Sequence, residues 1–158
     1  MKPVTLIPRW VAALAVSLAA CHAPTAPSPI TIVNPSADDI LAHRALWAAH
    51  APPLYSYVVT TSGGFGASFN DRPLQVVVRN DTVEMATFFD TQQPFSKPYT
   101  FWPPTIDGLF DLAAYRVGEG ELSAISFDSV LSYPARMAFT NPDLPSIEAA
   151  DLSSATPR

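Results

Sequence analysis

The segment TIDGLFDLAAYRV, residues 105–117, carries the clearest periodic pattern in this 158-residue chain. Its apolar residues recur at spacings of three, four and seven, which places them on one stripe of a helix. They are Ile106, Leu109, Phe110, Ala113 and Val117. Thr105 is positioned to cap the helix at its start, and Gly118 and Gly120 favour its end. The segment therefore predicts an amphipathic helix with one face directed into a core.

A first helix is predicted upstream, beginning at the N-cap Ser36 and stopped by the pair Pro52-Pro53. Asp38 and Asp39 follow the cap, where negative charge complements the helix dipole. Its stripe contains Ile40, Arg44 and Trp47, with Leu41 and Ala45 beside it. The sequence thus predicts two helices of about three turns each.

The segments around the helices alternate between apolar and polar residues, which is typical of strands with one wet face. Asn80-Asp81 is a two-residue turn signal between two of them. The expected strands are residues 54–62, 74–79, 83–89, 124–127 and 135–139. We expect an α+β fold with a single antiparallel sheet of about five strands, two helices on one face, and the order α-β-β-β-α-β-β.

The N-terminal residues have the features of an export signal. Lys2 and Arg9 precede an apolar run over residues 10–20, which is too short to span a bilayer. Leu18-Ala19-Ala20-Cys21 resembles the lipobox of bacterial lipoproteins, and Cys21 is the single cysteine. The resemblance implies cleavage between Ala20 and Cys21 and attachment of acyl chains such as palmitate to Cys21. An ordinary secretory signal with a chance cysteine is the alternative.

These features divide the chain into four expected parts. Residues 1–20 form the signal peptide, and residues 21–35 form the lipidated cysteine with a proline-rich tether. At about 3.1 Å per extended residue, the tether would reach roughly 40 Å. Residues 36–140 form the globular domain, and residues 141–158 form a tail in which we expect little regular structure.

The charge balance narrows the classes of partner. Removal of Lys2 and Arg9 with the signal leaves seven basic against fourteen acidic residues, a net charge of −7. This balance argues against nucleic acid and against charge-driven adhesion to anionic lipid. His22 follows the lipidated cysteine, and the absence of Asp there resembles the outer-membrane sorting pattern of diderm bacteria. The expected location is therefore the cell envelope, with the outer membrane facing the periplasm favoured in a diderm organism.

Four groups of residues together resemble domain-of-unknown-function family 6174, a family of bacterial lipoproteins. They are residues 104–112, the residues Trp47 and Tyr55-Ser56-Tyr57, the expected hairpin from Leu74 to Val83, and Phe127-Asp128 with the segment Ser132-Tyr133-Pro134-Ala135-Arg136. The match covers about residues 40–140 and implies a fold and an envelope address but no activity. Members often carry a cysteine pair after the first strand and a glycine before Tyr-Pro. This chain has no cysteine over residues 62–73, and it has Ser132 at the glycine position.

The sequence contains no catalytic motif. Asp39 and His43 have a spacing that can share a metal ion, but a solvated helix face is the favoured explanation of the pair, and the sequence does not place the two further ligands that a metal site needs. Residues 62–66 (SGGFG) form neither a nucleophile elbow nor a phosphate-binding loop. Asp107 and Asp111 are paired carboxylates, a pattern that suits acid–base chemistry, although a negative charge near a helix start is also favoured by the dipole. We therefore predict no cofactor and no metal.

Two aromatic segments are the candidate partner-binding surface, since aromatic side chains dominate interface energetics. The alternative is that these rings fold back over the sheet. The candidate residues are Phe65 and Phe69 in the first segment and Tyr99, Phe101 and Trp102, with Phe95 nearby, in the second. The expected function is that of a non-enzymatic envelope lipoprotein that binds a protein, or a small ligand, or stabilises a larger complex. A hydrolase or metal-dependent enzyme with a dispersed site is the alternative.

Overall fold

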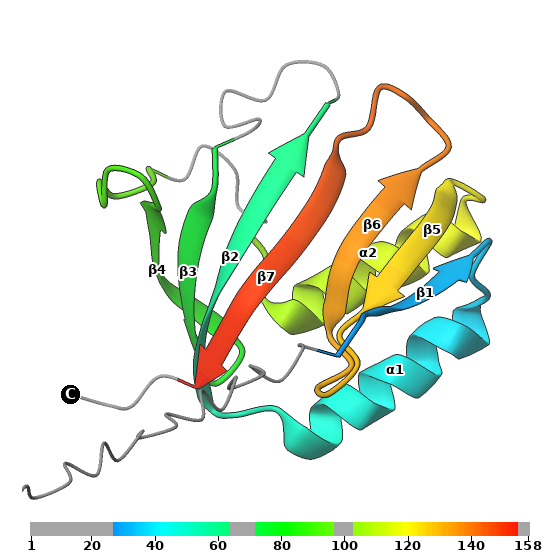
Figure 1. The fold of residues 1–158 in the computed structure, drawn as a ribbon, viewed down its shortest axis with the longest axis horizontal. Coiled ribbons are helices and arrows are strands. Elements are labelled where there is room, and N and C mark those ends of the chain that lie inside the picture. Colours follow the sequence, from blue (N-terminus) through cyan, green and yellow to red (C-terminus); the bar gives the residue numbers. More distant parts are fainter. Residues whose placement is uncertain (1–26, 64–71, 97–102, 155–158) are drawn as a thin grey trace, which may run out of the picture.

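A single antiparallel sheet with two helices forms the domain in a computed structural model that describes residues 27–63, 72–96 and 103–154 (Figure 1). The sheet has seven strands in the order β1-β5-β6-β7-β2-β3-β4. In chain order the elements are β1 (Ile30–Val33), α1 (Ala37–His50), β2 (Leu54–Ser62), β3 (Leu74–Arg79), β4 (Thr82–Phe88), α2 (Ile106–Gly118), β5 (Leu122–Phe127), β6 (Pro134–Phe139) and β7 (Ser146–Ser154). The α+β class is confirmed, but the prediction of about five strands is wrong, and so is the predicted order.

Both additional strands lie where the sequence predicted none. β1 falls inside the expected tether of residues 21–35 and pairs with β5 as an edge strand. β7 falls inside residues 141–158, which were expected to have little regular structure, and it pairs with β2 and with β6. Its sequence SIEAADLSS buries only Ile147 and Ala149 and has few of the residues that favour strands. β7 nevertheless joins the β1–β5–β6 half of the sheet to the β2–β3–β4 half.

The two helices cover the same face of the sheet, as predicted, and they meet at Phe127 of β5 (Figure 1). The imidazole of His43 in α1 stacks on the Phe127 ring with a centroid distance of 3.7 Å and an interplanar angle of 3°. Phe110 of α2 contacts the same ring with a centroid distance of 6.2 Å. The largest fully buried side chains gather here and include Trp47, Tyr57, Phe110 and Phe127.

The predicted local signals are confirmed. The Ser36 and Asp39 side chains form a reciprocal capping box at the start of α1, and the Thr105 hydroxyl accepts a hydrogen bond from the Gly108 amide. Asn80 and Asp81 both have positive φ (46° and 55°), as a tight hairpin turn requires. Within the described ranges, no helix is both long enough and apolar enough to span a bilayer.

The backbone at Ser132 has a conformation that favours glycine. Ser132, at the position before Tyr-Pro where family members often have glycine, has a φ of 62°. This value lies in the left-handed region that glycine adopts without steric cost. The Asp128 side chain accepts hydrogen bonds from the amides of Val130 and Leu131 in the same turn.

Candidate functional site

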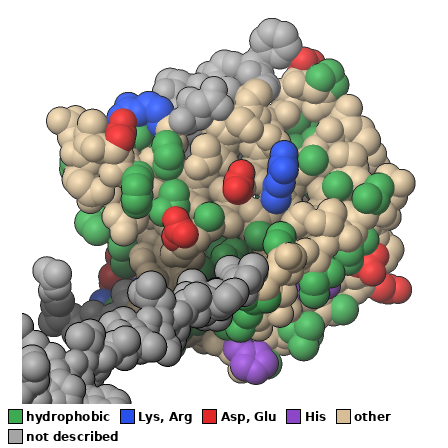
Figure 2. Space-filling view, in the orientation of Figure 1, with side chains coloured by type: hydrophobic (Ala, Val, Ile, Leu, Met, Phe, Trp, Pro, Cys, Tyr) green, Lys and Arg blue, Asp and Glu red, His purple; other side chains and the backbone are tan. Residues whose placement is uncertain are grey.

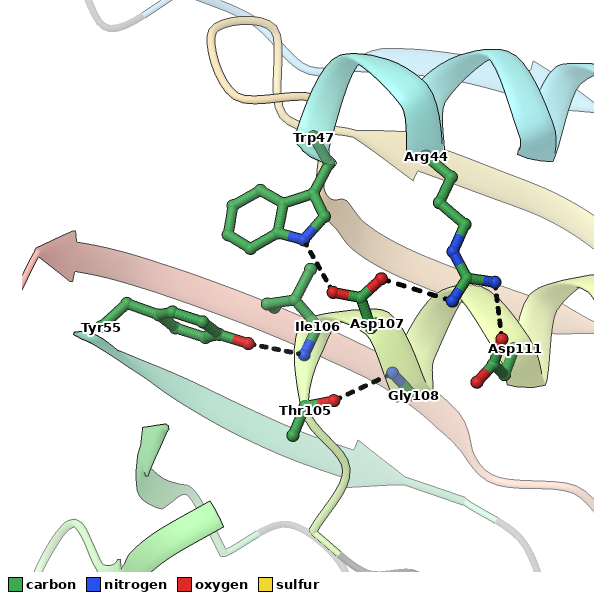
Figure 3. A network of polar contacts seen from close by, with 8 residues as sticks. All are labelled: Arg44, Trp47, Tyr55, Thr105, Ile106, Asp107, Gly108 and Asp111. Carbon is green, nitrogen blue, oxygen red and sulfur yellow. Dashed lines mark hydrogen bonds and ion pairs between the residues drawn. The ribbon is translucent and has the colours of Figure 1, made fainter. Parts of the chain in front are cut away.

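The start of α2 is held by tyrosine hydroxyl groups from β2. The Ile106 amide donates a hydrogen bond to the Tyr55 hydroxyl at 3.1 Å (Figure 3). The Tyr57 hydroxyl donates a hydrogen bond to the Pro104 carbonyl. A Cβ added at Gly108 would meet Pro104 Cβ at 3.1 Å, which explains why glycine occupies this position of the helix start. The amides of Ile106 and Gly108, which lack partners within the helix, are therefore satisfied by side chains.

Asp107 and Asp111, the paired carboxylates of the sequence, both face α1. Arg44 reaches the two carboxylates together, with 3.3 Å between Nη2 and Asp107 Oδ1 and 2.6 Å between Nη1 and Asp111 Oδ1. The indole Nε1 of Trp47 donates a hydrogen bond to Asp107 Oδ2 at 3.3 Å (Figure 3). The two carboxylates thus join α2 to α1.

Burial keeps the tyrosines of this network neutral. Loss of solvation raises the pKa of Tyr55 to about 12 and raises the pKa of Tyr57 well above its ordinary value. Burial also raises the pKa of Tyr133, whose ring contacts Trp47 edge-on. A neutral phenol retains its proton, as the hydrogen bond from Tyr57 to Pro104 requires. The raised pKa values of Tyr55 and Tyr57 are therefore consistent with a structural role, in which their neutral hydroxyl groups bond the start of α2.

Asp39 and His43, considered above as a metal pair, have separate surroundings. Asp39 accepts hydrogen bonds from the Ser36 amide and hydroxyl, and these bonds lower its carboxyl pKa. Burial against Phe127 lowers the pKa of His43, while the nearby charge of Asp39 opposes the shift. Among the described residues, no group of three or more His, Cys, Asp or Glu side chains is placed to hold a metal ion.

The face of the sheet opposite the helices, called here the open face, was not singled out from the sequence. A polar row crosses five of its strands through cross-strand partners, and Arg136 of β6 is the partner of Glu148 of β7 within it. Figure 2 shows a basic and an acidic side chain close together near the middle of this face. The row consists of Thr31, Ser126, Arg136, Glu148 and Thr60. Arg136 and Glu148 are both exposed, and the ion pairs among the described residues do not include them. The sequence gives a sign of this row only in β6, where Arg136 alternates with the apolar residues Ala135 and Met137.

Several predicted site residues lie outside the described residues. They are Ala20 and Cys21 of the cleavage site and the aromatic residues Phe65, Phe69, Tyr99, Phe101 and Trp102. Phe95 is described, and its ring packs edge-on against Phe88 with a centroid distance of 5.7 Å. For Phe95, therefore, the alternative of a ring folded back onto the sheet is correct.

One of the comparisons with known proteins identifies a family. The model of the Family of unknown function (DUF6174) matches residues 39–144, which is more than half of the chain. The chain belongs to this family. The match extends from α1 to the segment between β6 and β7, and it includes Trp47 and Asp107, which are hydrogen-bonded, and the two tyrosines that bond the start of α2. No curated protein and no solved structure matches the chain significantly.

Proposed function

We propose that this member of the DUF6174 family is a lipid-anchored protein of the bacterial envelope, held through acyl chains on Cys21. The support is the short export signal and the single cysteine at the lipobox position. One acyl chain gives marginal membrane binding, whereas two or more give stable anchoring. In a diderm organism the anchored chain faces the periplasm from the outer membrane.

The anchor is tested by metabolic labelling with a palmitate analogue in cells that express the full chain. We expect the label in the wild-type protein and none in Cys21→Ser, which also accumulates with its signal uncleaved. Equal labelling of the two proteins contradicts the anchor.

We further propose a non-enzymatic role, in which the anchored domain binds an envelope protein. The observation that carries this proposal is that the sequence's candidate acid–base groups are engaged in structural contacts. Asp107 and Asp111 pair with Arg44, Asp39 caps α1, and His43 packs on Phe127. A catalytic acid or base needs a lone pair or proton available to a substrate, and the ion pairs with Arg44 and the hydrogen bonds from Ser36 occupy lone pairs of Asp107, Asp111 and Asp39.

The open face supplies the surface for such a partner. Helices take up the other face, and the polar row provides exposed groups of both signs at Arg136 and Glu148 (Figure 2). Exposed charged groups of this kind set specificity and orientation at protein interfaces. The five aromatic residues at positions 65, 69, 99, 101 and 102 are the second proposed contact.

Site-specific photocrosslinking in cells tests this surface. A benzophenone amino acid at position 148 of the lipidated chain is compared with the same probe at Tyr115, which is 58% exposed on α2. We expect a discrete adduct from position 148 that is absent from position 115 and is lost in Arg136→Asp. The same adducts from both positions, or none from position 148, contradict the proposed surface.

A further inference from the structure

The outer face of α1 is apolar along its whole length after the first turn. Leu41 is 60% exposed and Leu46 is 51% exposed. Every exposed residue from position 41 to position 49 is alanine or leucine, namely Leu41, Ala42, Ala45, Leu46, Ala48 and Ala49. At about 100° per residue these six side chains form one stripe roughly 160° wide. The stripe lies opposite the inward residues Ile40 and Trp47.

Such a stripe is unusual for the outside of a surface helix. A surface helix ordinarily directs charged and polar residues outward, and a helix that is apolar all round is covered on both sides. Of the polar residues of α1 beyond its first turn, His43 and Arg44 contact Phe127 and α2, and His50 is exposed at the C-terminal end of the helix. Figure 2 shows hydrophobic side chains along the lower edge of the domain, where α1 runs, beside a histidine.

The N-terminal segment enters the fold beside the middle of this helix. Ile30, the first residue of β1, is the cross-strand partner of Phe127, and Phe127 stacks on His43 in the central turn of α1. Ile30 is nine residues after Cys21. Nine residues span at most roughly 30 Å when fully extended. An acyl group on Cys21 therefore keeps Ile30, which is linked to the middle of α1 through Phe127, within about 30 Å of the bilayer.

We propose that the outer face of α1 docks on the bilayer that holds the Cys21 lipid. This inference rests on the proposed lipid anchor. The stripe contains none of the Trp, Tyr and Arg residues that dominate protein–protein hot spots. It also contains no Lys or Arg to attract anionic lipid, so apolar contact with the interface is its chemistry. The anchor supplies the high effective concentration at which such a small apolar face binds.

The test uses the lipidated full chain reconstituted into phosphatidylcholine vesicles. Because acylation consumes Cys21, the thiol in Leu46→Cys is unique and accepts an environment-sensitive fluorophore. Met85→Cys is the matched control, since Met85 is also 51% exposed but lies on β4, at the opposite edge of the sheet from β1. We expect blue-shifted emission at position 46 and about twofold or greater quenching by spin-labelled lipid relative to position 85.

A second variant separates docking from folding. Ala45→Glu in the Leu46→Cys background places a charge in the middle of the stripe, and we expect quenching to fall to the level of position 85 with the circular dichroism unchanged. Equal quenching at positions 46 and 85 in floated vesicles overturns the docking. Blue-shifted emission without lipid quenching also overturns it and identifies a protein contact instead. Failure of the chain to float with vesicles identifies failure of the anchor itself.

Discussion

The two helices pack on the same sheet face but differ on their outer surfaces. α2 buries Ile106, Leu109, Phe110 and Ala113 and leaves polar side chains such as Asp111 exposed. α1 buries Ile40 and Trp47 and exposes only leucine and alanine between positions 41 and 49. In α2 the apolar residues of the stripe are the ones that the domain buries, so packing within the domain explains their positions. In α1 the exposed side also consists of apolar residues, and these additional apolar residues point to a contact beyond the described domain.

The difference also concerns how each helix is held. The start of α2 is held by hydrogen bonds to the hydroxyl groups of Tyr55 and Tyr57 on the sheet strand β2. α1 is attached laterally through Trp47 and Arg44 to Asp107. Substitutions on the inward and outward sides of the helices show how much each side contributes to the free energy of unfolding.

The largest expected effect comes from the inward side of α1. Trp47 is fully buried, so Trp47→Ala leaves a cavity and removes the donor to Asp107. We expect a loss of about 3–5 kcal/mol in the free energy of unfolding, measured by urea denaturation of the mature Cys21→Ser domain. Leu46→Ala on the outer side is expected to change stability by less than about 0.5 kcal/mol. Similar losses in the two variants would contradict the assignment of inner and outer faces.

Tyr57→Phe tests the attachment of α2. The substitution removes the hydroxyl donor and leaves the Pro104 carbonyl without that partner. Because Tyr57 is almost completely buried, we expect a cost of about 1–2 kcal/mol in the same urea measurement. Tyr55→Phe, which removes the acceptor of the Ile106 amide, is the parallel variant and is expected to cost a similar amount. Wild-type stability in both variants would show that α2 is held by apolar packing alone.

Arg44→Met tests the link between the two helices. The ion pairs with Asp107 and Asp111 are partly exposed, so we expect a loss of only about 1 kcal/mol that decreases in 0.5 M NaCl. A double-mutant cycle with Asp111→Asn isolates the Arg44–Asp111 term. A loss that is independent of salt would indicate that the arginine acts through packing of its aliphatic stem.

The smallest expected effect is the pH dependence contributed by His43. Burial lowers its pKa in the folded state, so protons bind the unfolded chain more readily. His43 therefore contributes stability above its unfolded pKa of about 6.5, and this contribution is lost as pH falls through that value and the lower folded pKa. Between pH 7 and pH 5 the melting temperature of the wild type is expected to fall further than that of His43→Gln. Parallel profiles would show that the imidazole titrates as it does in water.

The sequence predicts those helices and turns that are stabilised by residues close to them in the chain. Thr105 and Ser36 are caps, Asn80-Asp81 is a turn, and the stripe from Ile106 to Val117 is a helix face, and all four are read correctly from spacing. The partners of Asp107 could not be read in this way. Arg44 and Trp47 are about sixty residues away in the chain, and only the packing of α1 beside α2 brings them together.

What the sequence by itself determined is the two helices and the five recognised strands, because each depends on periodicity, capping or turn residues. Only the tertiary structure decided that β1 and β7 are strands, since their hydrogen-bond partners belong to β5, β6 and β2. The structure also decided that Leu41 and Ala45, which flank the predicted stripe of Ile40 and Trp47 on α1, are exposed. A helix with apolar residues beyond one stripe does not show how wide its buried face is until its neighbours are in place.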